Sequence, residues 1–596
     1  MLLTALLAAP CAARTKMRSP NGRLTMTTEA DGLRLHCNGQ PVLDITRMGY
    51  DSEWSATPEL KANGRVTADY RMLSGKRQHC TNRANEYIAK LSPRLTLRLR
   101  LYDDGLAFRY ELCGLAHECV TPEYTTYHIA EGTQRWMMPW SDGYEGFYAP
   151  ATTCADGRWA FPALLQPAEG TFVLLTEAGI ERHRSAASMH NKGEDFNVVA
   201  DRNELLLTGD WSSPWRVAIV GSLADVVEST LVTDVAPACR LTDTSWIEPG
   251  VVSWVYWAYN HGSNDYNIIK QYVDLAATLH LPYVLIDAEW DEMRDGKTIE
   301  DAVRYARERG VRPLIWYNSC MGWINGAPGP KFRLNVPEKR EREFAWCDSI
   351  GVAGVKIDFF GGDDVRNMNY CIDLLECAAR HHLTVNFHGA TVPRGWQRTY
   401  PNLMSTEGVY GAEWYNNVPT FTTRAAAHNA TLPFTRNVIG PMDYTPCAFS
   451  DSQHPHITTH AHELALTVLY ESGLQHLADR PESLLAQPQQ VQDFFSNLPA
   501  AWDETRLVSG YPGRDVVMAR RSGTTWYVAG INGTEQPLDL DLTGLKKTLR
   551  AKKSAQCQLF LDADEDRAWQ LRTATVADLT TIHMRARGGF VIVIRQ

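Results

Sequence analysis

Two charged residues near the end of one apolar run point to chemistry rather than packing. In the segment GVAGVKIDFFGG, residues 351–362, Lys356 and Asp358 lie two positions apart. Side chains at positions i and i+2 of a β-strand point to the same face, so the ammonium group is expected beside the carboxylate. A nearby positive charge stabilises the ionised carboxylate, which is the form that a nucleophile requires. Asp358 is therefore the first candidate catalytic residue.

Polar residues also follow the neighbouring apolar runs. In chain order these residues are Asp287, Glu289, Asn318, Asn386, His388, Glu407, Glu413 and Asp443. If the runs are parallel strands of one barrel, these side chains share the rim at which barrel enzymes bind substrates. Structural alternatives exist, because Asp287 can orient Lys356 through an ion pair and Asn386 can satisfy backbone groups. Taken together, the residues predict one acidic pocket mouth.

The types of these residues favour hydrolysis of a glycosidic bond. One carboxyl group of a glycosidase protonates the leaving oxygen, and a second carboxylate attacks the anomeric carbon or activates water. Glu413 lies in the segment GAEWY, where partial desolvation raises the pKa of a carboxyl group and suits a proton donor. The sequence contains no Gly-rich phosphate loop, dinucleotide fingerprint or nucleophile elbow.

The region that must position these residues alternates between strand and helix patterns from about Ser253. Strand patterns such as PYVLIDAEW and VRPLIWYNS are followed by helical patterns such as TIEDAVRYARERG. NVIGPMDYT and GLQHLAD are interpreted as strands seven and eight. Eight strands in this alternation predict a central (β/α)8 barrel, the TIM barrel.

All-β regions flank the predicted barrel. The segment LTLRLRLYDD alternates apolar and basic residues with period two, and similar segments follow as far as about residue 240. They predict an N-terminal β-sandwich, and the hairpin pattern near the end predicts a small antiparallel C-terminal β-domain. The predicted divisions are 1–18 for a signal-peptide remnant, 19–245 for the sandwich, 246–502 for the barrel and 503–596 for the last domain.

Composition excludes several partners. The net charge of -10 argues against nucleic acid or an anionic membrane, and no apolar stretch after the N-terminus is long enough for a membrane span. The first residues, MLLTALLAAPCAARTK, resemble a secretory signal and predict export, to the periplasm in particular; a frayed apolar terminus is the alternative. The 13 cysteines are scattered, which favours buried thiols, with Cys80, Cys113 and Cys119 as candidates for a disulfide.

The chain resembles glycoside hydrolase family 97. The resemblance rests on KIDFF, on the run NFHGATVPRGWQRTYPNLMSTEGVYGAEW and on the domain order. Gly389 follows His388, where the inverting branch of that family carries a base glutamate, and Asn318 stands where that branch carries a second base. The resemblance therefore implies the retaining, α-galactosidase-like branch, with Asp358 as nucleophile and Glu413 as acid/base.

The same resemblance implies a bound Ca²⁺, with Glu407 as a ligand and Glu145, in DGYEGFYAP, as a second ligand from the sandwich. It implies a glycoside or oligosaccharide substrate, contacted by a set of rim residues: Lys356, His388, Asp287, Glu289, Trp290 and Asn318. Trp290 can instead belong to the core. An α-glucosidase, a β-L-arabinopyranosidase, a non-catalytic sugar-binding protein and an enolase-type lyase are the alternatives. A monomer and a homodimer are both compatible with the sequence.

Overall fold

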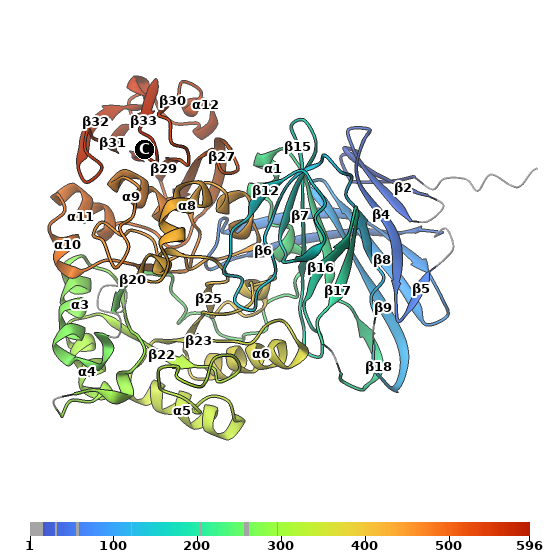
Figure 1. Cartoon of the computed structure of the whole chain (residues 1–596), viewed down its shortest axis with the longest axis horizontal. Helices are drawn as coiled ribbons and strands as arrows, with labels where there is room; N and C mark the ends of the chain where they lie inside the picture. Colours follow the sequence, from blue (N-terminus) through green and yellow to red (C-terminus); the bar gives the residue numbers. More distant parts are fainter. Residues whose placement is uncertain are drawn as a thin grey trace, which may run out of the picture.

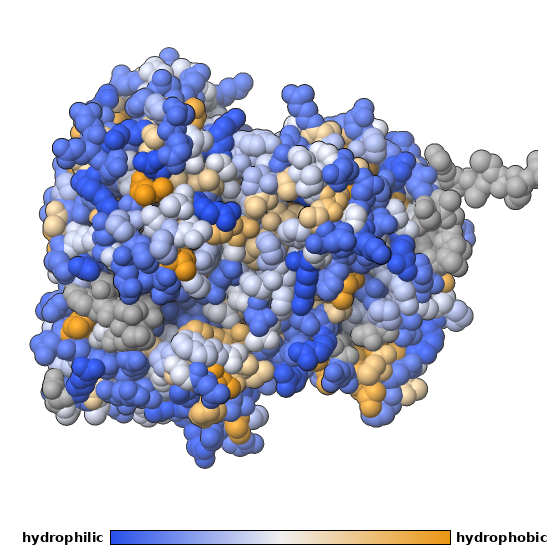
Figure 2. Space-filling view, viewed as in Figure 1, coloured by the Kyte–Doolittle hydropathy of each residue, from blue (hydrophilic) through white to orange (hydrophobic). Residues whose placement is uncertain are grey.

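The computed structural model describes residues 16–29, 32–54, 59–120, 122–202, 204–255, 262–294 and 296–596. In Figure 1 an N-terminal region of sheets lies on the right, a barrel lies at lower left and a small β-domain lies above the barrel. The face seen in Figure 2 is mostly hydrophilic, with scattered apolar residues. Residues 1–15 of the predicted signal lie outside the described residues, so export stays a prediction.

Two antiparallel sheets form the N-terminal region, as the alternating sequence predicts. The first sheet contains β1 (Lys16–Arg18), β2 (Leu24–Thr28), β3 (Leu33–Cys37), β4 (Gln40–Tyr50), β5 (Ser52–Trp54), β10 (Thr126–His128), β13 (Gly157–Trp159), β16 (Ala187–Lys192) and β17 (Asp195–Ala200). The second contains β6 (Lys61–Arg71), β7 (His79–Lys90), β8 (Leu95–Tyr102), β9 (Gly105–Glu118), β11 (Gln134–Met137), β12 (Ala149–Ala151), β14 (Ala163–Ala168), β15 (Thr171–Ala178), β18 (Leu207–Ser212) and β19 (Trp215–Gly221). The leucines of β8 are fully buried in the core of this region, whereas its arginines point outward.

The central region is a parallel barrel of seven strands. Its hydrogen-bonded order is β25 (Leu403–Thr406), β24 (Thr384–Phe387), β23 (Gly354–Asp358), β22 (Arg312–Asn318), β21 (Tyr283–Ile286), β20 (Gly250–Val255) and β26 (Leu474–Leu477). The longer helices that accompany these strands are α3 (Tyr266–Thr278), α4 (Ile299–Glu308), α5 (Pro337–Ile350), α6 (Val365–Arg380), α8 (Pro419–Asn429) and α9 (His460–Leu469). The strands are buried along their whole length except at Arg312, the first residue of β22, as expected for parallel strands covered by helices.

The seventh predicted strand is not a strand. NVIGPMDYT begins in the 3₁₀ helix η5 (Arg436–Ile439) and continues as irregular backbone. This segment still fills the gap between β25 and β26, because the Met442 amide donates to Glu471 O at 2.8 Å and the Asp443 amide donates to Thr406 O at 3.1 Å. Pro441, which has no amide hydrogen to donate, accounts for one missing ladder bond. Asp443 therefore reaches the rim without a strand.

The C-terminal region is a small antiparallel domain, as predicted. One sheet has the order β27 (Glu504–Tyr511), β28 (Asp515–Ser522), β29 (Thr525–Asn532), β34 (Gly589–Arg595), β31 (Gln556–Asp562) and β32 (Trp569–Thr575). A second sheet pairs β30 (Leu538–Asp541) with β33 (Thr581–Met584), beside the short helix α12 (Leu545–Leu549). Helix α9 of the barrel packs against β29 and β34, so the two domains share part of one core.

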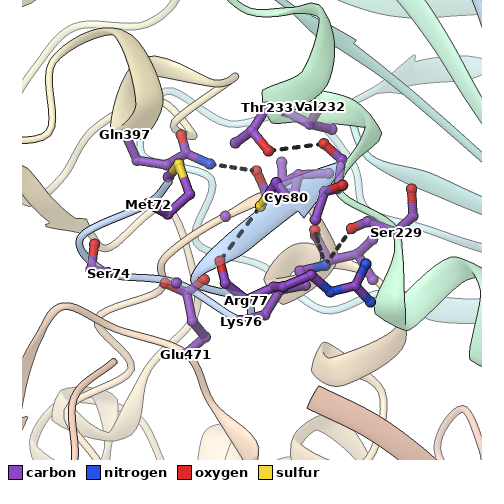
Figure 3. Close-up of a pocket in the computed structure, with 15 residues that line it drawn as sticks. Met72, Ser74, Lys76, Arg77, Cys80, Ser229, Val232, Thr233, Gln397 and Glu471 are labelled. Atoms are coloured by element: carbon purple, nitrogen blue, oxygen red, sulfur yellow. Dashed lines mark hydrogen bonds between the residues drawn. The ribbon is translucent and has the colours of Figure 1, made fainter. Parts of the chain in front are cut away.

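A buried lysine joins the N-terminal region to the barrel. Two short helices, α1 (Leu223–Glu228) and α2 (Leu231–Val235), connect the sandwich to the barrel. Figure 3 shows Lys76 beneath them, in a small cavity that Ser229 and Glu471 also line. The Lys76 ammonium donates to three carbonyl oxygens, those of Val227, Ser229 and Val438, at 2.9, 3.0 and 2.8 Å. Three donors matched to three acceptors satisfy the ammonium without water.

No helix within the described part of the chain is long and apolar enough to cross a membrane.

The twelve cysteines at described positions are all free, including Cys80, Cys113 and Cys119. The suggested disulfide among these three is therefore wrong. Cys80 is buried in β7, and its thiol faces the Arg77 carbonyl oxygen at 3.5 Å.

Candidate active site

Successive strands deliver the rim residues in matched layers. In the parallel ladder Trp316 of β22 is in register with Lys356 of β23, and Lys356 is in register with Asn386 of β24. Two residues further along, Asn318 is in register with Asp358. Because residues two apart on a strand share a face, Lys356 and Asp358 point to the same side, as the sequence predicts.

Hydrogen bonds hold the carboxylate of Asp358 in one orientation. The Trp316 indole N–H donates to Oδ2 at 3.1 Å, and the Phe359 amide donates to Oδ1 at 2.8 Å. The Lys356 ammonium lies 3.9 Å from Oδ2. Burial raises the pKa of Asp358 above its ordinary value, whereas the positive charge of Lys356 lowers that pKa. The lysine therefore acts in the predicted direction, against a larger effect of burial.

Asp287 orients Lys356 through an ion pair, the alternative recognised in the sequence. The Lys356 Nζ lies 3.0 Å from Asp287 Oδ2, and the Trp254 indole donates to the same oxygen at 2.8 Å. Burial lowers the pKa of Lys356, but Asp287 and Asp358 outweigh burial and bring the pKa above its ordinary value. The lysine is therefore charged at neutral pH, between two carboxylates.

Four residues form an acidic cluster near Asp358 at the rim: Glu145, Glu407, Glu413 and His388. One ligand atom each of His388, Glu407 and Glu413 lies within 4.8 Å of the other two. Glu407 leaves the end of β25 and accepts from the Gly389 amide at 2.7 Å, while Glu413 is presented by the 3₁₀ helix η3 (Ala412–Asn416). Glu145 comes from the sandwich, and its carboxylate accepts from the Trp414 indole at 2.7 Å.

The acidic cluster contains mutually repelling carboxylates. Burial and then the charge of Glu413 raise the pKa of Glu145 to about 8. Burial and the same neighbour raise the pKa of Glu407 well above its ordinary value. Burial likewise raises the pKa of Glu413, although Lys356 acts in the opposite direction. Such a group holds either shared protons or a cation that offsets the charge.

The donor set fits a hard divalent cation. Carboxylate oxygens are the ligands that calcium prefers, and the buried Nδ1 of His388 has no hydrogen-bond partner among the described residues. That nitrogen lies 3.5 Å from Glu407 Oε2, so it borders the same space. The residues predicted to bind metal, Glu145 and Glu407, are thus brought together with Glu413 and His388.

Asp443 fixes the ring of His388 from behind. The carboxylate Oδ2 of Asp443 lies 2.7 Å from His388 Nε2 and 2.8 Å from His476 Nδ1. The same oxygen accepts a hydrogen bond from the side-chain amide of Asn386 at 2.6 Å. Burial alone would raise the pKa of Asp443, but the two histidines lower it far below its ordinary range. Burial, together with Lys356, lowers the pKa of His388. The neutral imidazole therefore turns Nδ1 toward the acidic cluster.

A charged cluster at the domain junction supports Glu145. This junction cluster consists of Glu123, Glu177, Arg216, Asp363 and Arg394. Arg394 donates to the hydroxyl of Tyr144 at 2.6 Å, and that hydroxyl donates to Asp363. Since Tyr144 directly precedes Glu145, the buried network fixes the sandwich loop that enters the barrel mouth. Asp364, and not Asp363, caps α6 by accepting from the Asn367 amide at 2.9 Å.

Two predicted substrate residues are occupied with the scaffold. Trp290 is 3% exposed, and its ring stacks on Trp346 and meets Tyr317 edge-to-face. It therefore packs on the helix side of β22, which favours the core alternative for this residue. Asn318 accepts from the Cys320 amide at 2.8 Å and donates to the Trp323 carbonyl oxygen, so it braces the loop after β22.

Glu289 lies at the rim beside another polar residue. The side-chain amide of Asn264 donates to Glu289 Oε2 at 3.0 Å.

Sequence reasoning missed Trp316, Trp414 and His476. Trp316 could have been found, because it precedes Asn318 by two residues and so shares its face. The roles of Trp414 and His476 depend on contacts between distant segments.

A second group of metal-binding residue types lies between α5 and α6 and has a structural explanation. Glu341, Cys377 and His381 approach within 4.8 Å of one another. The Arg380 guanidinium donates to Glu341 at 2.7 Å, and His381 lies 2.8 Å from it. These contacts already satisfy the glutamate and join the two helices.

The acidic rim and the three-domain architecture define a hydrolase of glycosidic bonds. Three family models match the chain: "Glycosyl-hydrolase 97 N-terminal" over residues 17–237, "Glycoside hydrolase 97" over residues 246–409, and "Glycosyl-hydrolase 97 C-terminal, oligomerisation" over residues 501–595. The chain belongs to glycoside hydrolase family 97, as the sequence resemblance implies.

Relatives of known name agree with this assignment. A "Probable retaining alpha-galactosidase" of Streptomyces bingchenggensis (strain BCW-1) is 34% identical, over 96% of this chain and 90% of the relative. A "Retaining alpha-galactosidase" of Bacteroides thetaiotaomicron is 26% identical, over 97% of this chain and 96% of the relative. Among solved structures, a beta-arabinopyranosidase has a TM-score of 0.88 and 28% identity, covering 97% of this chain and 100% of that one.

Proposed function

We propose that the protein is a retaining α-galactosidase that removes terminal α-galactosyl residues through a covalent glycosyl-aspartate. The observation that carries the proposal is the environment of Asp358. Both of its oxygens are hydrogen-bonded, and Lys356 is 3.9 Å away. The two relatives named as retaining α-galactosidases match nearly the whole chain and support the choice of sugar.

In the first half-reaction Asp358 attacks the anomeric carbon from the face opposite the leaving group. Glu413 gives its proton to the glycosidic oxygen as the carbon–oxygen bond breaks, and the aglycone departs as an alcohol. Burial raises the pKa of Glu413, which favours the protonated form that this step needs. The product is an ester between the sugar and the Asp358 carboxylate.

In the second half-reaction Glu413, now ionised, takes a proton from water. The water oxygen attacks the anomeric carbon, the ester bond breaks, and Asp358 returns as a carboxylate. Two inversions at the same carbon give a sugar of retained configuration. Lys356 stabilises the carboxylate that is regenerated.

The remaining rim residues bind and orient. We assign hydrogen bonds with sugar hydroxyls to Lys356 and His388. Asp287 fixes the ammonium group of Lys356, and Asp443 fixes the imidazole ring of His388. Glu289 is assigned to the same hydroxyl-binding rim. Lys356 and His388 are buried, so they exclude water from the reacting centre.

The metal proposed for the acidic cluster is Ca²⁺, held by Glu145 and Glu407 beside Glu413 and His388. When bound, the ion supplies positive charge that offsets the carboxylates and polarises the site. Glu145 and Glu407 hold it, while the Trp414 and Gly389 N–H groups orient these two carboxylates.

The nucleophile is tested with Asp358→Ala. We expect kcat to fall by about 10⁴-fold or more, and azide to restore turnover as the β-glycosyl azide. Proton NMR of the wild-type reaction should show free galactose with the α-anomer formed first. Asp364→Asn, which keeps the cap of α6, is the matched control and should leave kcat unchanged. Unaltered activity of Asp358→Ala, or the β-anomer as first product of the wild type, contradicts the mechanism.

A second candidate substrate is a β-L-arabinopyranoside. The structural neighbour of TM-score 0.88 carries that activity in its name. A β-L-arabinopyranoside has the ring configuration of an α-D-galactoside without the C6 hydroxymethyl group, so the same two carboxylates can act on both. Nitrophenyl α-galactoside, α-glucoside and β-L-arabinopyranoside, compared by kcat/KM, separate these candidates. A higher value for either of the last two replaces α-galactoside as the preferred substrate.

A further inference from the structure

An exposed indole lies next to the proposed nucleophile. Trp323 is 52% exposed, although tryptophan is among the most apolar side chains. It belongs to the loop that joins β22 to α5, at the mouth of the barrel. Its ring centroid is 5.0 Å from that of Phe359, the residue that directly follows Asp358. The indole therefore presents an exposed apolar face at the barrel mouth, next to the proposed nucleophile.

Three aromatic rings form a continuous row from the nucleophile to solvent. Trp316 is buried and donates its indole N–H to Asp358 at 3.1 Å. The ring of Phe359 lies 5.8 Å from that of Trp316, and the ring of Trp323 follows it. The row therefore begins at the carboxylate and ends at a solvent-exposed ring.

The loop that carries Trp323 is bonded to the backbone of the nucleophile. The Ser319 amide donates to Asp358 O, and the Gly322 amide donates to Phe359 O, each at 2.8 Å. The Ser319 hydroxyl donates to Phe359 O at 2.8 Å as well. A Cβ at position 322 would lie 2.8 Å from two backbone oxygens, so only glycine permits this approach.

The indole itself is also held in place. Its N–H donates to the Asn325 carbonyl oxygen at 2.7 Å, and Asn318 donates to the carbonyl oxygen of Trp323. The ring is thus fixed before any ligand arrives, which reduces the entropy cost of binding. Asn318, predicted to touch substrate, supports this loop.

We propose that Trp323 is the platform for the leaving-group sugar, the unit on the aglycone side of the cleaved bond. The inference rests on the proposed function. The glycone sits against Asp358 inside the rim, so the leaving group extends outward, along the aromatic row. The C–H face of a pyranose is apolar and packs on an indole. The substrate class is therefore α-glycosides whose aglycone is itself a sugar.

Comparison of two substrates tests this assignment. Raffinose, an α-galactosyl oligosaccharide, has a sugar leaving group, whereas α-galactosyl fluoride has a leaving group of one atom that cannot reach Trp323. We expect Trp323→Ala to lower kcat/KM for raffinose by about tenfold and to leave the value for the fluoride within about twofold. Trp323→Phe should retain most of the activity toward raffinose. Equal loss on both substrates, or no loss on raffinose, overturns the proposal.

Phe332 provides the matched control, because it is 49% exposed on the same loop. Phe332→Ala should change neither value, and a loss on raffinose equal to that of Trp323→Ala would contradict the assignment to Trp323. Wild-type enzyme that cleaves neither substrate would contradict the proposed function instead.

In a third measurement, an added acceptor sugar competes with water for the glycosyl-enzyme. Trp323→Ala should lower the fraction of transfer product, and an unchanged fraction would count against the platform.

Discussion

Two buried clusters of charge meet at Tyr144 and Glu145, and they differ in balance. The junction cluster holds two arginines against three carboxylates, and neighbouring acids raise the pKa of Arg216 and Arg394 despite burial, which lowers it. The acidic cluster holds three glutamates with a histidine that is neutral, and the pKa of each glutamate is raised. The nearly balanced charge of the junction cluster holds domains together, whereas the unbalanced charge of the acidic cluster is held ready for a proton or a cation.

Within these two clusters, the largest expected effect comes from removing the proton of Glu413. Glu413→Gln should lower kcat/KM by about 10³-fold for substrates with poor leaving groups, such as oligosaccharides. A substrate with a good leaving group, such as α-galactosyl fluoride, should lose far less kcat/KM, because its first half-reaction needs no protonation. Steady-state kinetics with both substrates checks this. Equal losses on both substrates would show that Glu413 has a structural role rather than a role in proton transfer.

The junction cluster is broken by Arg216→Met. This change leaves Glu123 buried without its arginine and leaves Glu177 with Arg394 alone, so unfolding free energy should fall by about 3 kcal/mol or more. Denaturant unfolding measures the loss. Arg304→Met, which removes an exposed arginine paired with Asp301, is the control and should change stability by at most about 0.5 kcal/mol. A loss equal to that of the control would show that the cluster does not stabilise the fold.

A smaller change follows from Lys356→Met. Without the ammonium, the pKa of Asp358 rises, since Lys356 normally lowers it. The acid limb of the kcat/KM profile should therefore move to higher pH, and the maximum should fall by about 100-fold. Lys356→Arg keeps the charge and should leave the limb near its wild-type position. If the acid limb does not shift in Lys356→Met, the ionisation of Asp358 does not determine that limb.

The smallest predicted effect concerns the metal. A chelator should lower activity and added Ca²⁺ should restore it, because the acidic cluster needs an offsetting charge. Glu145→Gln should weaken Ca²⁺ binding by about tenfold, measured by isothermal titration with the intact protein. Full activity after verified metal removal would refute the calcium proposal. Glu131→Gln, a sandwich substitution outside the cluster, should bind Ca²⁺ like the wild type.

Much of the fold could be predicted because local patterns determine it. The alternation in LTLRLRLYDD yields β8, and the strand–helix cadence yields the barrel. Strand seven could not be predicted correctly, because NVIGPMDYT looks apolar and extended while its backbone bonds are made to two flanking segments. Its residue Asp443 was nevertheless expected at the rim, since position along the chain fixes it there.

The candidate site divides in the same way. The i, i+2 rule was enough to bring Lys356 and Asp358 together, because both lie on one strand. Trp290 illustrates the limit: the turn after β21 directs its ring behind β22, and nothing local in DAEW reveals that. Glu145 was found through family resemblance, because the network that carries it into the barrel spans domains that are far apart in sequence.

The conformation of Gly389 constrains how this site can diversify. Its φ of 49° disfavours other residues, and a Cβ there would lie 3.0 Å from Asp358 Oδ1 and 3.1 Å from the Phe359 amide nitrogen. A side chain at position 389 and a carboxylate at position 358 therefore compete for one volume. A side chain at position 389 therefore requires the carboxylate at position 358 to move or to be shortened, so the first position can change only together with the second.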